Sequence, residues 1–411
     1  MQPTQAIRPS RRDTLAGMFT LGAAAWLQGD KLASLGPPRT LLILQLAGGN
    51  DGLSMVVPHG DDRYHSLRPN LRQSAETVLA LDDYRGLHPA LKRLREVYAK
   101  GSLALIEGAG YPNPIRSHFK SFDVWHAGDL RGRAIPQGWV GRFASSAFAT
   151  DSNPNLIVHV GGSPPYSLHS TSHPPAAFVT PAGYRWAGEK AEQEAYESAG
   201  MESGAPSKDK DAQAEPKEQG SLDFLRKVLS DGQSSSVAIR RAAARYQTPV
   251  EYPDESFATT LRNVAALVNG GLGTRVFSVE LGGFDTHTDQ KNRHDQLMRR
   301  LDGGLGAFLE DLQRTEAGKQ VVILVFSEFG RRVKENGSRG TDHGVAAPMF
   351  VLGAPVKGGL FGKHPSLADL DDGDLAHTID FRSVYGSLLQ SWFGVPHERV
   401  LGQRFPLLDL V

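Results

Sequence analysis

Three runs of apolar, strand-like residues in this chain end in glycine and an acid. The runs cover residues 41–46, 276–281 and 321–326, and the acids that follow them are Asp51, Asp285 and Glu328. Continuous β-branched and aliphatic runs are typical of strands buried on both faces of a parallel sheet. Ligands of such sheets bind beyond the carboxyl ends of the strands. We therefore expect the three acids to converge on one site that suits metal-assisted chemistry.

Histidines accompany two of these acids. Asp285 and His287 stand two apart in one loop, so in an extended segment both side chains point to the same side. His343 follows Asp342 in a Gly-rich loop, and we expect His343 to bind metal while Asp342 orients it or a neighbour. The predicted metal ligands are Asp51, Asp285, His287, Glu328 and His343. Carboxylates with imidazoles suit one or two divalent ions, which are Zn, Mn, Mg or Ca.

Each acid also has a purely structural interpretation. Asp51 lies in a Gly-Gly-Asn-Asp-Gly turn, where an aspartate commonly caps a helix. Glu328 ends the most hydrophobic strand, so it needs a partner, and the alternative to a metal is a salt bridge to Arg331 or Arg332. The residues that we expect to support the ligands or to contact an anionic group are Asn50, Asp342 and Arg331.

A nucleophile is expected at a helix start, where backbone amides and the helix dipole favour anions. Pro112 and Pro114 break the chain just before Ser117, which is placed at or near the start of the next helix. Arg116 suits an oxyanion, and His118 suits proton transfer or metal ligation. The candidate catalytic residues are therefore Ser117, Arg116 and His118. The alternative for Ser117 is an ordinary helix N-cap.

Composition excludes several classes of protein. Lys+Arg and Asp+Glu both total 45, so the formal net charge is zero and no basic excess points to a nucleic-acid partner. The chain has no Cys, which excludes disulfides, Cys-ligated zinc and iron–sulfur clusters. A redox enzyme is disfavoured further because no Gly-x-Gly-x-x-Gly fingerprint follows a strand.

The N-terminus has the pattern of an export signal. Arg11 and Arg12 precede a weakly apolar run over 15–27, which is typical of a twin-arginine (Tat) signal. We expect residues 1–35 to be this signal and a linker, with the Tat translocase as a partner and a periplasmic or extracellular destination. The alternative is an amphipathic N-terminal helix with a chance arginine pair. No later segment approaches the roughly 20 apolar residues of a membrane span, so we expect no transmembrane segment in the mature chain.

The rest of the chain alternates between strands and helices, which predicts an α/β fold with a mainly parallel central sheet and helices on both faces. Strands are expected from 41, at 102–107, 155–160, 275–281, 320–326 and 349–352, and helices at 87–100, 117–125, 221–246, 257–270, 294–312 and 380–392. We expect a single domain over 40–411. A charged, flexible insertion is expected at about 188–220, because that stretch nearly lacks large apolar residues.

The motifs together resemble those of the DUF1501 family of Tat-exported bacterial proteins. Besides the twin arginines they are Leu-Ala-Gly-Gly-Asn-Asp-Gly-Leu-Ser (46–54), Arg-Ser-His-Phe (116–119), Gly-Gly-Phe-Asp-Thr-His (282–287), Phe-Ser-Glu-Phe-Gly-Arg (326–331) and Asp-His (342–343). The family is distantly similar to the alkaline phosphatase/sulfatase superfamily. The resemblance implies an alkaline phosphatase-like fold, with Asp51 and Glu328 on a first metal and Asp285, His287 and His343 on a second. It also implies Ser117 as the nucleophile.

Two departures from the superfamily pattern separate the functional hypotheses. Glu328-Phe329 stands where alkaline phosphatases have an Asp-His pair, and the motif of formylglycine sulfatases is missing around Ser117. The first hypothesis is an exported, metal-dependent hydrolase of phosphate or sulfate esters, small or polymer-borne, that uses Ser117 or a metal-bound water as nucleophile. The alternative is a catalytically inactive periplasmic or envelope binding protein that retains the fold.

Overall fold

Parallel strands form the centre of the structure, as the apolar runs predicted. A computed structural model describes residues 37–185 and 216–411 of the chain. Neighbouring strands follow the order β11-β5-β10-β9-β1-β8-β6-β7, with β14 beside β5, and only β10 among them runs antiparallel to its neighbours. The strands are β1 (Thr40–Ala47), β5 (Leu103–Gly110), β6 (Ile157–Val160), β7 (Ala176–Phe178), β8 (Val276–Gly282), β9 (Val321–Phe326), β10 (Ala347–Leu352), β11 (Gly359–Phe361) and β14 (Ile379–Asp380).

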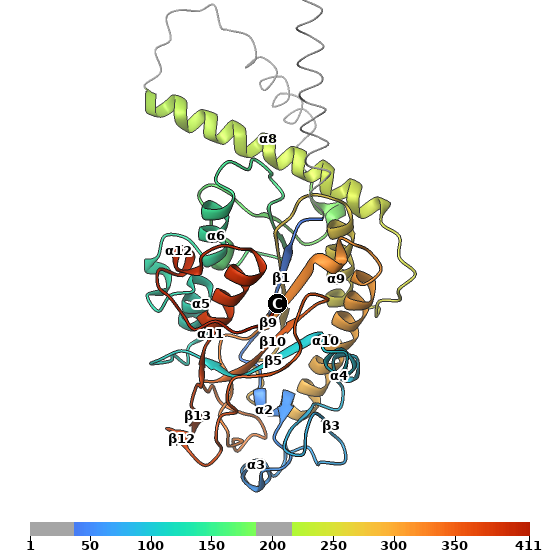
Figure 1. The fold of residues 1–411 in the computed structure, drawn as a ribbon, viewed down its shortest axis with the longest axis vertical. Coiled ribbons are helices and arrows are strands. Elements are labelled where there is room, and N and C mark those ends of the chain that lie inside the picture. The colour runs from blue at the N-terminus through green and yellow to red at the C-terminus, as the bar shows by residue number, and fades with distance from the viewer. Residues whose placement is uncertain (1–36, 186–215) are drawn as a thin grey trace, which may run out of the picture. The chain divides into compact units, whose positions relative to one another are not determined.

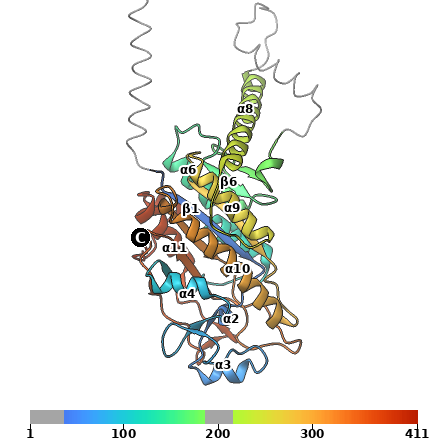
Figure 2. The same cartoon turned by 90° about the vertical axis from the view of Figure 1, so that its right-hand side faces the viewer.

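Helices cover both faces of this sheet (Figures 1 and 2). One face packs on α4 (Lys92–Ala99), α8 (Pro216–Arg245), α9 (Ser256–Asn269) and α10 (Gln290–Leu312). The other packs on α5 (His118–Ala127), α6 (Trp139–Ala147), α11 (Phe381–Ser387) and α12 (His397–Leu401). Along β1, Leu42 and Leu44 enter the first core and Leu41 and Ile43 enter the second. Because both faces are buried, the strand sequence is apolar throughout rather than alternating. The predicted fold class is confirmed.

The predicted helices all exist, with shifted ends. The helix expected from residue 87 begins only at Lys92, because Gly86–Leu87 is a short strand (β4). Helix α10 begins at Gln290, one turn before the expected start at 294. The last long helix divides into α11 and a π-helical turn over Leu388–Trp392.

Short elements fill the connections. They are β2 (Val56–Val57), β3 (Leu79–Ala80), β12 (Leu370–Asp371), β13 (Asp374–Leu375), α2 (Gly52–Met55), α3 (Asp62–Leu67) and the 3-10 turns Gly132–Ala134, Tyr166–Leu168, Pro181–Gly183 and Gly318–Gln320. Strands β2, β4 and β3 form a separate small sheet, and β12 pairs with β13.

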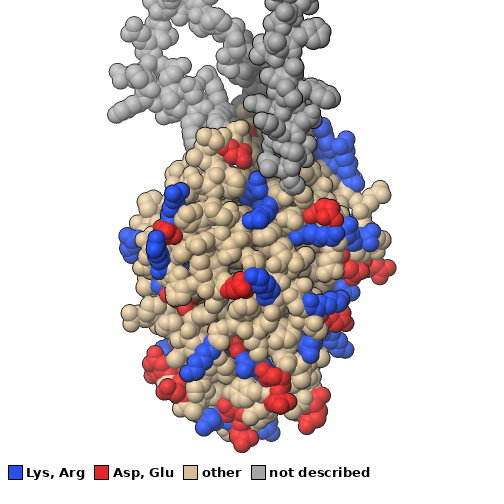
Figure 3. Space-filling view, in the orientation of Figure 1, with Lys and Arg blue, Asp and Glu red and all other residues tan. Residues whose placement is uncertain are grey.

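Residues Arg39–Val411 form one compact unit. The proposed signal over 1–35 lies outside the described residues, as does most of the expected insertion at 188–220, although residues 216–220 belong to α8. Within the described ranges, no helix is long and apolar enough to cross a membrane. On the face seen in Figure 3, Lys and Arg side chains are interspersed with Asp and Glu, as expected of a chain with zero net charge.

Candidate metal centre

The three acid-bearing strand ends meet at one edge of the sheet. Strand β1 pairs in parallel with both β8 and β9, so their carboxyl ends lie side by side. The loops after them pack closely, because Gly48 (φ +118) has no Cβ to collide with the backbone nitrogen of Asp285. Gly49 (φ +71) likewise leaves room for the ring of Phe329. These glycines allow the convergence that the sequence predicted.

Three imidazoles surround the carboxylate of Asp285. Its Oδ1 lies 3.0 Å from His287 Nε2, 3.2 Å from His343 Nε2 and 3.5 Å from His118 Nε2. The Nε2 atoms of His287 and His343 are 2.9 Å apart. His118, Asp285 and His343 form a group whose ligand atoms all lie within 4.8 Å of one another. The nitrogens of His118 and His343 and the oxygen of Asp285 therefore face a common point, and His287 Nε2 adjoins it next to Asp285 and His343.

The other ring nitrogen of each histidine is held by an oxygen. His118 Nδ1 lies 2.7 Å from Glu328 Oε1, and His287 Nδ1 lies 3.2 Å from Asp342 Oδ1. His343 Nδ1 lies 2.8 Å from the backbone carbonyl of Arg116. A carbonyl or an ionised carboxylate only accepts, so each Nδ1 carries the hydrogen. In the neutral rings each Nε2 then presents a lone pair to the centre, which is the arrangement of metal-binding histidines.

This donor set fits a divalent ion. Zinc binds imidazole nitrogen at about 2.0–2.1 Å in tetrahedral geometry, which puts its ligand atoms about 3.3 Å apart. The separations of 2.9 to 3.5 Å between the facing atoms bracket that spacing. His118 Nε2 is also buried without a hydrogen-bond partner among residues 37–185 and 216–411. Buried polar atoms are rarely left unpaired, so this nitrogen fits a ligand role.

The protonation of the cluster follows from its charges. Burial raises the pKa of Asp285, but the hydrogen bond and the charge of Arg331 outweigh it and lower this pKa to about 2. The hydrogen bond to Glu328 raises the pKa of His118 above its usual value, against the effect of burial. Asp285 is therefore ionised at neutral pH, and protons compete with metal for His118.

Asp51 occupies a different environment close by. Its side chain is 1% exposed, and its Oδ2 accepts hydrogen bonds from Arg68 Nη1 at 2.6 Å, from Ser54 Oγ at 2.7 Å and from Gln290. It stands at the N-cap of α2, yet its side chain caps no amide there. Burial raises the pKa of Asp51, and the charge of Arg68 overrides this and brings it to about 2. The structure thus gives Asp51 a protein cation and leaves it outside the histidine cluster.

Glu328 supports the cluster through His118. Its side chain is fully buried, and besides His118 it accepts from Gly48 N at 3.0 Å and Ser327 Oγ at 3.1 Å. Neither of the alternative salt bridges forms, because Arg331 binds Asp285 and Arg332 lies near Asp372 and Asp374.

The two arginines expected to contact an anion already have protein partners. Arg331 is 2% exposed, and it donates to Asp285 Oδ1 at 2.7 Å and to the carbonyls of residues 48, 49, 284 and 341. Arg116 forms ion pairs with Asp374 and Asp372. Its contribution to the centre is the carbonyl that orients His343.

Asn50 is buried away from solvent. Its Oδ1 accepts from His294 Nε2 at 3.0 Å, and its backbone nitrogen donates to Ser327 Oγ at 2.8 Å. Asn50 therefore ties the turn after β1 to α10 and to the end of β9. Its predicted role as a support is compatible with these contacts.

Ser117 lies where the sequence predicted, at the N-cap of α5 directly before His118. Its hydroxyl makes no capping hydrogen bond. The helix is anchored instead by Ser121, which donates to the carbonyl of Glu328 at 2.5 Å. The ordinary N-cap interpretation therefore accounts for the position of Ser117 and not for its hydroxyl.

His118 was expected to transfer a proton or to bind metal, but the aromatic ring beside it was not expected. The ring of Phe329 lies 4.8 Å from the ring of His118 and 4.8 Å from the ring of His343. Phe329 therefore packs against two imidazoles of the cluster. Arg68, the partner of Asp51, was not predicted, because a contact across 17 residues has no local signature.

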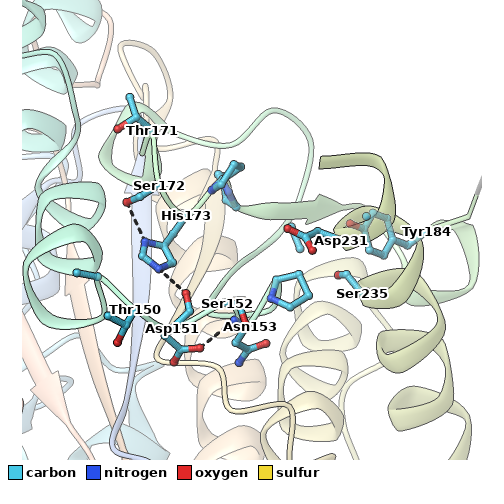
Figure 4. Close-up of a pocket in the computed structure, with 16 residues that line it drawn as sticks. Thr150, Asp151, Ser152, Asn153, Thr171, Ser172, His173, Tyr184, Asp231 and Ser235 are labelled. Carbon is cyan, nitrogen blue, oxygen red and sulfur yellow. Dashed lines mark hydrogen bonds between the residues drawn. The ribbon is translucent and has the colours of Figure 1, made fainter. Parts of the chain in front are cut away.

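A cavity of about 400 Å³ lies elsewhere, between the loops 149–154 and 171–176 and helix α8 (Figure 4). His173 bridges its two loops, since Nδ1 lies 2.9 Å from Ser172 Oγ and Nε2 lies 3.1 Å from the carbonyl of Asp151. The loop 149–154 precedes β6, so the cavity borders the amino end of that strand. None of the predicted site residues lines it.

Comparison with known proteins gives a family and a set of similar structures. Residues 163–403 match the family described as "Protein of unknown function (DUF1501)". No match was found among curated proteins.

Three of the similar structures each have 10% sequence identity to this chain. A protein in the alkaline phosphatase superfamily from Vibrio parahaemolyticus has a TM-score of 0.40, over 90% of this chain and 71% of that one. A sulfatase from Pseudoalteromonas sp. has 0.39, over 98% and 75%. The C-terminal periplasmic domain of EcEptC from Escherichia coli, in complex with Zn, has 0.39, over 88% and 83%.

Proposed function

Because the chain belongs to the DUF1501 family, whose description assigns no function, we propose one from its site: a metal-dependent hydrolase of phosphate or sulfate esters. One observation carries the proposal. The Nε2 atoms of His118, His287 and His343 lie 3.0 to 3.5 Å from one carboxylate oxygen of Asp285, and every Nδ1 is held by an oxygen acceptor. The lone pairs of these nitrogen and oxygen atoms repel one another when nothing lies between them, and a divalent cation removes this repulsion by binding them.

The surroundings favour one ion over two. Asp51 is neutralised by Arg68, and Glu328 is occupied by His118 and two further donors. Three imidazoles with one carboxylate suit zinc or manganese better than Mg or Ca, which prefer oxygen ligands. We therefore propose a mononuclear centre held by His118, Asp285, His287 and His343.

When bound, such an ion supplies Lewis acidity and a water of lowered pKa. The chain supplies the rest of the site. Ser117 stands directly before His118, and its hydroxyl caps no amide. It is therefore a second candidate nucleophile, besides that water. The amino end of α5 favours a negatively charged group there. Asp285 and His287 are 49% and 41% exposed, so a substrate reaches the centre from solvent. The ester class rests on the resemblance of the strand-end motifs to the alkaline phosphatase/sulfatase superfamily.

The proposal includes export by the Tat translocase, on the strength of Arg11 and Arg12. Replacing both arginines by lysine should leave the full-length protein in the cytoplasm, as judged by cell fractionation. Unchanged export of that variant would exclude the twin-arginine route.

The main test measures metal and hydrolysis together. Purified protein should contain close to one equivalent of Zn or Mn by elemental analysis, and chromogenic phosphate monoesters, diesters and sulfate esters should reveal hydrolysis that a chelator abolishes. Asp285→Ala should lose both metal and activity. The matched control is Asp409→Ala, since Asp409 is exposed and also holds one cation, Lys357.

Full activity after chelation, or in Asp285→Ala, would exclude the proposal. Bound metal without hydrolysis of any ester would favour the alternative, an envelope binding protein that retains the fold.

A further inference from the structure

Two of the most exposed apolar side chains flank the candidate centre. Phe119 is 84% exposed and Ile115 is 43% exposed, and they stand on either side of Ser117 and His118. Among residues 37–185 and 230–411, seven large hydrophobic residues are exposed, and no other two of them lie this close in sequence. Phenylalanine is usually buried, because removing its ring from water stabilises the folded protein. Phe119 is therefore costly where it stands.

Phe122 extends this apolar surface along the same helix. It lies three residues after Phe119, so the two side chains are neighbours on one face of α5. Its ring is 6.5 Å from the ring of His118 and stacks on His126 at 5.3 Å. We call Ile115, Phe119 and Phe122 the apolar rim.

Phe122 links the rim to the candidate centre, because its ring lies 6.5 Å from the ring of His118, whose Nε2 faces the oxygen of Asp285. Ile115 and Phe119 flank His118 in sequence. Ligand sites typically combine apolar and aromatic walls with a few polar groups that fix orientation. Here the polar groups are the cluster and Ser117, and the rim supplies the wall. A ligand bound at the centre is then the nearest candidate to cover Phe119.

We propose that the apolar rim binds an apolar or aromatic group in the alcohol part of the ester. This inference rests on the proposed function and adds a substrate class to it: esters of bulky apolar or aryl alcohols are preferred to those of small hydrophilic alcohols. Phe119 acts in specificity and takes no part in the metal centre.

Binding of two phosphonates tests the inference without turnover. Phenylphosphonate and methylphosphonate are titrated calorimetrically into zinc-loaded full-length protein. We expect phenylphosphonate to bind about tenfold more tightly, because its ring is removed from water against the rim. In Phe119→Ala the two affinities should become nearly equal. In Phe119→Leu most of the preference should remain.

Leu360→Ala is the matched control, because Leu360 is an exposed apolar residue on β11 at 37%. It should keep the wild-type preference. Equal affinities in the wild type, or an unchanged preference in Phe119→Ala, would overturn the inference. So would a change only in self-association or in binding to phospholipid vesicles, since the rim would then serve a second copy or a membrane surface.

Elemental analysis of the same samples separates this outcome from failure of the proposed function. If the protein takes up no zinc, the metal centre itself is wrong. If zinc is bound and the phosphonates are not distinguished, only the role of the rim is wrong.

Discussion

Asp51 and Asp285 follow adjacent parallel strands after similar Gly-Gly sequences, and the structure gives them opposite surroundings. The side chain of Asp51 is 1% exposed and holds Arg68, Ser54 and Gln290. The side chain of Asp285 is 49% exposed and faces three imidazole nitrogens. Both carboxyls have a pKa of about 2. A low pKa therefore does not distinguish a structural carboxylate from a candidate ligand.

The distinction lies in what else surrounds each acid. Asp51 is paired with a cation and two neutral donors, which is how proteins tolerate a buried charge. Asp285 has one cation, Arg331, but its other neighbours offer lone pairs rather than protons. In the first arrangement a protein cation already balances the charge, although Asp51 Oδ1 is buried without a hydrogen-bond partner among the described residues. The second requires a proton or a metal ion between the rings.

The largest effect is expected from removing an imidazole. His343→Ala should lower metal affinity by more than about a hundredfold, beyond the loss typical of residues that only support a ligand. Metal competition with a chromogenic chelator measures this. The control His65→Ala removes a partly buried histidine whose Nε2 lies 2.9 Å from the carbonyl of His59, and it should leave the affinity unchanged. Equal metal affinity in His343→Ala and His65→Ala would contradict the assignment of Asp285, rather than Asp51, to a metal site.

Breaking the Asp51 ion pair should affect stability instead. Arg68→Ala strands a buried carboxylate, which costs about 3–5 kcal/mol of unfolding free energy in typical buried pairs. Arg63→Ala breaks a pair whose arginine is 57% exposed, and should cost less than about 1 kcal/mol. Denaturant unfolding measures both. A folded Arg68→Ala protein of normal stability that has lost its metal would instead make Asp51 part of the metal site.

Acid should reveal the same ion pair. The pKa of Asp51 is about 2 in the folded protein and about 3.9 for a free aspartate, so the pair stabilises fully above pH ~4 and is lost as the pH falls towards 2. The loss is on the order of 2 kcal/mol. Unfolding free energies at pH 5 and pH 2.5 should differ more for the wild type than for Asp51→Asn. Asp285→Asn should change this difference less, because solvent screens its half-exposed carboxylate.

The smallest effect is expected from the support of His287. Asp342→Asn keeps an oxygen that can accept from His287 Nδ1 but removes the charge, so metal affinity should fall about tenfold. Asp372→Asn is the control, because Asp372 is a similarly exposed aspartate in an ion pair with Arg116. A loss as large as that of His343→Ala would make Asp342 a ligand in its own right.

Most of the fold could be predicted from apolar patterning. Residues 321–326 are all buried. A strand covered on both faces is apolar at every position, so its sequence is easily recognised. Helix ends were less accurate: α4 starts five residues late because a strand pair takes Gly86–Leu87. The start of α5 after the prolines was predicted correctly, since proline and serine chemistry at a helix start is local.

The candidate site likewise has features that the sequence predicts and features that depend on long-range packing. The sequence by itself determined which residue types gather at the strand ends, because parallel strands bring their carboxyl ends to one edge. Only the tertiary structure decided which acid met Arg68 and which met His118 and His343 besides its neighbour His287. Arg68 lies 17 residues from Asp51, and His343 and His118 lie 58 and 167 residues from Asp285, so these partners leave no local pattern. The tertiary structure also brought Glu328 to His118 rather than to the neighbouring arginines. A carboxylate's chemistry is set by its nearest charges and donors, and in this protein the long-range packing supplied them.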